Sequence, residues 1–244
     1  NEAVKIAEND ILVFSDANNI YKVDALKKLV RNFSDERVGV VCGELQYNEK
    51  NSDENFYWKY EVAIKKQESK NGWLLGANGS IYAVRKKAYV TLPEDSISDH
   101  LEPIKVYSNG LDVIYEPEAI AFEDVPDNVL QRKRRIILRS LVSMKYVLAL
   151  LNPFKKRSIF IPYISHKLIR WFLPFFLIII FFTTGLLMDN NNFYSYFFAI
   201  QILFYLFGWL FHPVRYFIHV NLASLLAVID WLTGQRQNTW DVIR

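Results

Sequence analysis

The first half of the chain alternates short apolar runs with amphipathic segments. Residues 11–14 and 38–42 are uninterrupted apolar runs bounded by polar residues, a pattern typical of strands that are buried on both faces of a sheet. Between them, apolar residues recur at helical spacing, at Val23, Leu26, Leu29, Val30 and Phe33. The order strand, helix, strand predicts a crossover unit with two parallel strands.

The segments that follow continue the same alternation. They predict a helix, a glycine-rich segment, a second helix and two short strands, at residues 56–70, 72–85, 101–110, 113–115 and 119–122. The single cysteine, Cys42, lies inside an apolar run, so no intrachain disulfide can form and a buried thiol is expected. This part of the chain therefore predicts a cytosolic α/β domain with a parallel or mixed sheet and flanking helices.

The second half is much more apolar. From Val129 an amphipathic basic helix runs towards Leu151, which suits a position in the plane of a membrane surface. Three long apolar segments follow, at residues 171–188, 193–211 and 216–232. The third is weakened by the polar residues His219, Asn221 and Asp230. The sequence therefore leaves open whether the third segment spans a membrane or lies at its surface.

Basic residues gather ahead of these apolar segments. Residues 131–170 contain eleven Lys and Arg residues and no Asp or Glu. Because positive loops stay in the cytoplasm, this side of the first span is predicted to be cytoplasmic and the link at 189–192 external. Nucleic acid could bind such a block, but the apolar spans follow at once. We therefore predict a lipid bilayer with an anionic surface as the partner, and no nucleic acid.

Two acidic positions offer chemistry. Asp16 and Asn18 directly follow the first predicted strand, and ligands of open α/β sheets bind outside the carboxyl ends of strands. An Asx turn that leads into the next helix would use the same residues. Asp99 precedes the helix at 101–110, where it is either an N-cap or first-turn residue or a catalytic carboxylate.

The order of four motifs, followed by apolar spans, carries a resemblance to a known family. The motifs are Asp16-Ala17-Asn18, Gly76-Ala77-Asn78-Gly79-Ser80, Ser98-Asp99 and Gln131-Arg132-Lys133-Arg134-Arg135. In these, and in its tail at Gly234-Gln235-Arg236 and Trp240, the chain resembles the membrane-integrated family 2 glycosyltransferases, relatives of the hyaluronan, chitin, cellulose and exopolysaccharide synthases.

The resemblance covers essentially the whole chain and implies three parts. Residues 1–128 would be the carboxyl-terminal part of a GT-A-like catalytic domain, an α/β fold with a mixed sheet. Residues 129–170 would form basic amphipathic interface helices, and residues 171–244 a membrane region with two or three spans. The chain would then be a multi-pass protein of the cell membrane with its catalytic part in the cytoplasm.

The resemblance also implies a metal site. The family's Asp-x-Asp turn holds a divalent cation against a nucleotide diphosphate, and Asp16 matches its first carboxylate. Asn18 stands at the second position as a neutral oxygen ligand. A hard cation such as Mg²⁺ or Mn²⁺ accepts an amide oxygen, although the site loses one negative charge.

Further residues follow from the same resemblance. Asp99 matches the last residue of the family's Thr-Glu-Asp motif, the general base for the acceptor hydroxyl, although Ile97 and Ser98 replace the preceding pair. The segment that includes Gly76, Asn78 and Gly79 would contact the sugars.

The family's Gln-x-x-Arg-Trp motif corresponds to Gln131, Arg134 and Arg135, which would bind the diphosphate. Arg135 replaces the tryptophan and removes a stacking platform, which argues against processive synthesis. The run from Arg132 to Arg135 could instead anchor the helix to lipid headgroups.

Two functions are compatible with these residues. The first is an inverting glycosyltransferase that moves a sugar from a nucleotide-diphosphate sugar to a glycan or lipid-linked acceptor at the cytoplasmic membrane face. The family's amino-terminal nucleotide-binding half has no counterpart before Asn1, so the resemblance implies a fragment that is inactive without it. The second function is a non-catalytic membrane partner of a polysaccharide synthase that retains the fold.

Overall fold

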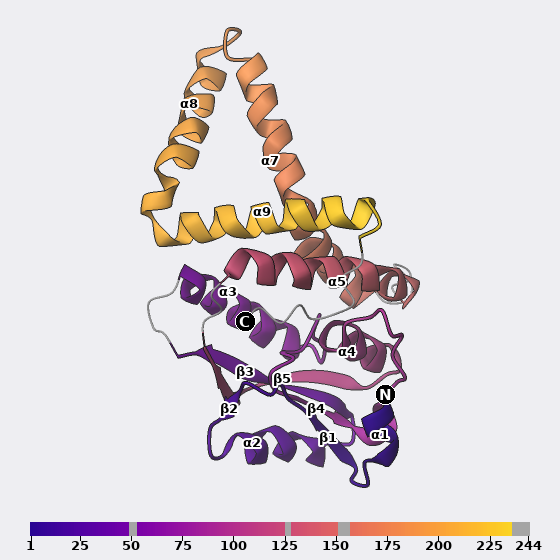
Figure 1. The fold of residues 1–244 in the computed structure, drawn as a ribbon. Helices are drawn as coiled ribbons and strands as arrows, with labels where there is room; N and C mark the ends of the chain where they lie inside the picture. Colours follow the sequence, from indigo (N-terminus) through magenta and orange to yellow (C-terminus); the bar gives the residue numbers. More distant parts are fainter. Residues whose placement is uncertain (49–52, 125–127, 151–156, 236–244) are drawn as a thin grey trace.

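The computed structural model describes residues 1–48, 53–124, 128–150 and 157–235. Its amino-terminal part is a five-stranded sheet with the order β1-β4-β3-β5-β2 (Figure 1). The strands are β1 (Ile11–Phe14), β2 (Ile20–Tyr21), β3 (Val38–Tyr47), β4 (Tyr82–Arg85) and β5 (Asp112–Glu123). Helix α2 (Ala25–Arg31) covers one face. The other face is covered by α3 (Asp53–Ser69) and α4 (Ser98–Ser108), and α5 (Val129–Leu150) lies over these two helices. The short α1 (Glu2–Ile6) comes before β1.

The sheet is mixed, which agrees with the predicted class and corrects its details. β3 and β5 are parallel, whereas β4 is antiparallel to both β1 and β3. The two strands of the predicted crossover unit therefore run in the same direction but do not pair, because β4 lies between them. The expectation that β1 is buried on both faces is also wrong. β1 is an edge strand among the described residues, and Val13 is 41% exposed.

The two short strands predicted at 113–115 and 119–122 form one strand, β5. The pairing of β3 with β5 jumps between Gly43 and Glu44, which lie opposite Glu116 and Ile120. Pro117 falls inside this irregularity, where its missing N–H group costs no ladder hydrogen bond. β5 therefore passes a proline without ending.

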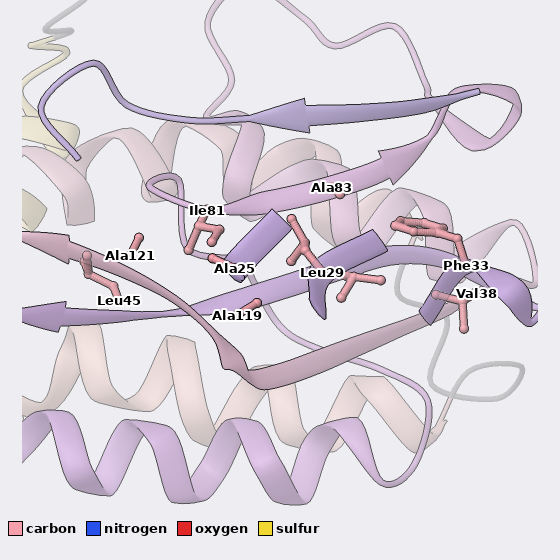
Figure 2. Close-up of a cluster of buried hydrophobic side chains, with 10 residues drawn as sticks. Ala25, Leu29, Phe33, Val38, Leu45, Ile81, Ala83, Ala119 and Ala121 are labelled. Atoms are coloured by element: carbon pink, nitrogen blue, oxygen red, sulfur yellow. The ribbon is translucent and has the colours of Figure 1, made fainter. Parts of the chain in front are cut away.

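The core between α2 and the sheet contains small and branched apolar side chains (Figure 2). Ala25, Leu29 and Phe33, spaced four residues apart, point from α2 and the following turn towards β3, β4 and β5. The predicted apolar face of this helix was partly wrong, because Leu26 and Val30 are 47% and 40% exposed. The small side chain of Ala25 permits close approach to the sheet, so the buried stripe is rotated from the one that the larger residues predicted.

The carboxyl-terminal part consists of helices that extend away from the sheet. They are α6 (Arg157–Tyr163), a π-helical turn (Ile164–Leu168), α7 (Ile169–Leu186), α8 (Asn192–Phe207) and α9 (His212–Leu232). Three helical segments are long and apolar enough to cross a membrane: Ile159–Leu186, Asn192–Leu210 and His212–Leu232. These agree in position with the three predicted apolar segments.

The third segment differs from the other two in its setting. α7 and α8 form a hairpin that projects from the molecule, whereas α9 crosses its base and lies along α5 (Figure 1). Of the most apolar 18-residue stretch of α9, 33% is buried against the rest of the protein, compared with 6% of the corresponding stretch of the α8 segment. Arg134 of α5 forms a two-bond ion pair with Asp230 of α9, with N–O distances of 2.6 and 2.7 Å. The tail motif at Arg236 and Trp240 lies outside the described residues.

Candidate active site

Two carboxylates predicted from the sequence meet at one glycine. Because β1 pairs antiparallel with β4, the residues that follow β1 lie beside those that precede β4. Asp16 and Gly79 are brought together in this way, and Asp99 approaches from the first turn of α4. A Cβ atom added to Gly79 would lie 3.1 Å from Asp99 Oδ2 and 3.8 Å from Asp16 Oδ2. Gly79 therefore leaves open the space between the two carboxylates.

The Asp16 side is open to solvent. Asp16 is exposed, and its Oδ2 atom accepts a 3.4 Å hydrogen bond from the Ser80 hydroxyl. Asn18 is also exposed, and its amide nitrogen donates to Glu123 Oε1 at 3.2 Å. Neither of these hydrogen bonds uses the second carboxylate oxygen of Asp16 or the side-chain amide oxygen of Asn18.

Glu123, the last residue of β5, was not among the predicted site residues. Its carboxylate lies beside Asn18 and pairs with Arg132 of α5 at 3.1 Å. Arg132 also donates to the Tyr47 hydroxyl at the end of β3. Asp16 was predicted because it is a carboxylate at the carboxyl end of a strand. Glu123 has the same position at the end of β5. An acid therefore stands next to Asn18 even though position 18 itself is neutral.

The Asp99 side is enclosed. Asp99 is a first-turn residue of α4 and not its N-cap, which is Ile97, and this position is compatible with a catalytic role. The Oδ1 atom of Asp99 is buried and has no hydrogen-bond partner among the described residues. Burial raises the pKa of Asp99, and Asp16 raises it further, whereas Lys167, Lys65 and Arg139 lower it.

The glycine-rich segment is fixed by Asn78. The Asn78 backbone N–H donates to Cys42 Sγ at 3.1 Å, and its side-chain amide donates to the Gly43 carbonyl at 2.6 Å. Lys65 of α3 donates to the Asn78 side-chain oxygen. The buried Asn78 amide thus ties the loop to β3 and α3, and next to it the Ala77 N–H donates to the Asp99 carbonyl at 2.7 Å. Cys42 is buried, as its apolar setting suggested.

The three α5 residues that were predicted to bind the diphosphate have different surroundings. Gln131 is exposed in the first turn, and Arg134 is engaged with Asp230 of α9. Burial, together with the neighbouring Arg139 and Arg132, lowers the pKa of Arg135. The spacing of these three arginines places them on one face of α5, and Arg139 on that face acts on Asp99.

Residues 1–91 match the model of glycosyl transferase family 2. The match contains Asp16 and the glycine-rich segment and ends before Asp99. No curated protein sequence matches the chain.

The fold extends the similarity beyond the family match. The chain superposes on the mannosyltransferase PcManGT from Pyrobaculum calidifontis, solved in complex with GDP-Man and Mn²⁺, with a TM-score of 0.73 and 18% sequence identity. The superposition covers 96% of this chain and 66% of that protein, so this chain spans about two thirds of its neighbour's length. At this identity the likeness shows the fold alone, a GT-A-like mixed sheet with flanking helices.

The side chains around the Asp16 turn fit a hard divalent cation. The described residues contain no group of three or more His, Cys, Asp and Glu side chains arranged as a metal site. Asp16 and Asn18 supply oxygen atoms only, the ligand type that Mg²⁺ and Mn²⁺ prefer. A cation with few protein ligands normally completes its shell with substrate phosphates and water. The turn therefore suits a cation that arrives with a diphosphate.

Proposed function

We propose that the protein is a membrane-bound inverting glycosyltransferase that uses a nucleotide-diphosphate sugar. The observation that carries this proposal is the approach of Asp16 and Asp99 to the two sides of Gly79. One carboxylate is exposed and suited to a cation, while the other is enclosed and suited to accept a proton. The family match over residues 1–91 and the glycosyltransferase fold support the same reaction class.

Asp16 and Asn18 would hold Mg²⁺ or Mn²⁺, which when bound offsets the negative charge of the diphosphate. Gln131 and Arg135 would bind that diphosphate from α5. Arg134 would also bind the diphosphate, but only after its ion pair with Asp230 has opened. Gly76, Asn78 and Gly79 would border the sugars, with Gly79 providing the space and Asn78 holding the loop in place.

Asp99 would act as the general base. Its carboxylate accepts the proton of the acceptor hydroxyl while that oxygen bonds to the anomeric carbon of the donor sugar. The bond from the same carbon to the diphosphate breaks on the opposite face, which inverts the configuration. Partial burial raises the pKa of Asp99, which makes its carboxylate a stronger base than an exposed one.

The acceptor would be a glycan or a lipid-linked molecule at the cytoplasmic face. The exposed apolar surfaces of α7 and α8 support a position in a bilayer, and the α5 and α9 pair supports an interfacial layer between the bilayer and the sheet. The basic residues of 131–170 suit the anionic cytoplasmic surface.

The test is sugar transfer by the full protein in membranes, using labelled UDP- and GDP-hexoses with Mn²⁺. We expect Asp99→Asn to lower turnover by about 10²- to 10⁴-fold, because an amide cannot accept the proton. Asp10→Asn, an exposed acid before β1, is the matched control and should leave turnover unchanged. Full turnover by Asp99→Asn in correctly inserted protein would exclude this mechanism.

The second candidate, a non-catalytic membrane partner of a polysaccharide synthase, is favoured by one observation. The neutral Asn18 stands where the family has an acid, and its amide donates to Glu123. Metal-dependent hydrolysis of a nucleotide sugar by the isolated protein would exclude this candidate. A lack of hydrolysis with every donor, together with binding to a synthase, would favour the non-catalytic function.

A further inference from the structure

The segment that joins the sheet domain to the first apolar helix makes contacts that no sequence motif indicated. His166 Nδ1 lies 3.1 Å from Glu68 Oε1 of α3. One turn later, Arg170 pairs with Glu61 of the same helix. The base of α7 is therefore held to α3 by two acid–base pairs.

Aromatic contacts hold the same segment to α4. The rings of Trp171 and His100 have centroids 6.0 Å apart, and His100 Nε2 lies 3.3 Å from the Tyr163 hydroxyl. Burial lowers the pKa of His100 to about 3, so its ring is neutral near pH 7 and serves as a packing and hydrogen-bonding contact. Because His100 follows Asp99 directly, these contacts fix the turn of α4 that carries Asp99.

Lys167 lies between these two sets of contacts, in the π-helical turn Ile164–Leu168. Such turns insert a residue into a helix, redirect the neighbouring side chains and recur at functional sites. Lys167 Nζ lies 3.8 Å from the position that a Cβ atom on Gly76 would occupy, and the Asp99 carbonyl oxygen lies 3.4 Å from the same point. The ammonium group thus enters the loop that borders Asp99.

The charges around Asp99 come from four elements. The carboxylate is faced by one acid and three cations: Asp16 after β1, Lys65 of α3, Arg139 of α5 and Lys167. Among the cations, Lys167 has the largest effect in lowering the pKa of Asp99. Lys65 donates to Asn78.

Lys167 itself is faced by both signs of charge. The cations Arg170 and Lys65 repel it, and the acids Glu61 and Glu68 attract it. Both acids are paired with other side chains, Glu61 with Arg170 and Glu68 with His166. Asp99 is therefore the acid near Lys167 whose Oδ1 atom has no hydrogen-bond partner in the described part of the chain.

We propose that Lys167 is a positioning residue for Asp99, so that docking of the membrane helix α7 completes the base of the active site. Its ammonium group balances the Asp99 carboxylate and holds it towards Gly79. The inference rests on the proposed function in one respect, the assignment of Asp99 as the base. It adds that a residue at the base of α7, rather than of the sheet domain, sets the geometry of sugar transfer.

The experiment compares Lys167→Met, Lys167→Arg and the control Lys27→Met in the full protein. Lys27 is exposed on α2, on the opposite face of the sheet. We expect Lys167→Met to lower kcat by about 10- to 100-fold, the cost of a misplaced catalytic group, while the donor KM changes less than about twofold. Lys167→Arg should recover most of kcat, and Lys27→Met should match wild type.

A double-mutant cycle tests the contact without any substrate. The unfolding midpoints of Asp99→Asn, Lys167→Met and the double variant should be non-additive, because each substitution removes one partner of the same proposed electrostatic interaction. Additive shifts would overturn the proposal, as would an unchanged kcat in Lys167→Met or a loss confined to the donor KM. If wild type turns over no donor, the proposed function fails, and the cycle still decides whether Lys167 acts on Asp99.

Discussion

The two faces of the sheet have different interiors. Between α2 and the sheet, the buried apolar cluster includes Ala25, Leu29 and Ile81, and the buried acid on this side, Glu116, is paired with Arg31 at the end of α2. On the opposite face, under α3, α4 and α5, the buried residues also include polar and ionisable ones: Glu68, Asn78, His100, Glu102 and Ser143. Apolar burial stabilises a fold, whereas a buried ionisable group costs stability unless it is well paired. The α2 face therefore mainly supports the fold, and the opposite face contains the proposed site.

The largest expected effect is on stability, from the apolar face. Leu29→Ala removes a fully buried side chain of α2 and should lower the free energy of unfolding by about 2–5 kcal/mol. Leu26→Ala on the same helix, where the side chain is 47% exposed, is the matched control and should cost less than about 1 kcal/mol. Denaturation followed by circular dichroism measures both. Equal losses of unfolding free energy in the two variants would contradict the conclusion that α2 buries Leu29 and exposes Leu26.

The next effect is the loss of stability at high pH that a buried acid causes. Glu102 of α4 accepts a 3.1 Å hydrogen bond from the Tyr82 hydroxyl, and its Oε1 atom is buried without a partner among the described residues. Burial raises the pKa of Glu102 to about 7. The folded state therefore favours the protonated acid, and stability is lost as the pH rises from the unfolded pKa, near 4.5, through about 7.

Glu102→Gln should remove this loss, because glutamine stays neutral. The variant should equal wild type near pH 5 and exceed it at pH 8 by up to about 3 kcal/mol in the free energy of unfolding, the value of this pKa shift. Unfolding curves at the two pH values measure the difference. The same difference at both pH values would show that Glu102 does not titrate in this range.

The smallest effect on stability, with a clear effect on rate, is expected between the two carboxylates. In Gly79→Ala the new Cβ would lie 3.1 Å from Asp99 Oδ2, so the carboxylate must move by a few tenths of an ångström. We expect turnover to fall by about 10- to 100-fold, while the unfolding midpoint stays within the range of ordinary surface variants. Transfer assays and melting curves test this together. A large loss of stability with normal turnover of the folded fraction would contradict it.

Local patterns in the sequence predicted several features of the molecule. The apolar run of β1, the basic helix α5 and the apolar helices α7 and α8 each depend on nearby residues, and the structure contains all of them. Asp16 and Asp99 could be selected because each lies at the end of an apolar element. Their joint approach to Gly79 could not be predicted, because it depends on the pairing of β1 with β4.

The missed features all depend on distant partners. No local signal places β4 between β1 and β3, since the strand order depends on pairing between residues far apart in the chain. Leu26 and Val30 of α2 have the spacing of a buried stripe, yet the sheet selects the stripe with the smaller Ala25. Glu123 has the same strand-end position as Asp16, but its contact with Asn18 and the effect of Lys167 on Asp99 each join residues more than 60 positions apart in the chain.

The position of α9 along α5 has a consequence for the kind of membrane in which the protein can work. A helix that crosses a bilayer must match its thickness, whereas a helix that lies flat is indifferent to it. Since α9 is joined to α5 through Asp230 and Arg134, the proposed arrangement in a bilayer would place two stacked helices between the lipid and the candidate active site. The α7–α8 hairpin could then tilt to suit thin or thick bilayers while the height of the candidate site above the lipid stays constant.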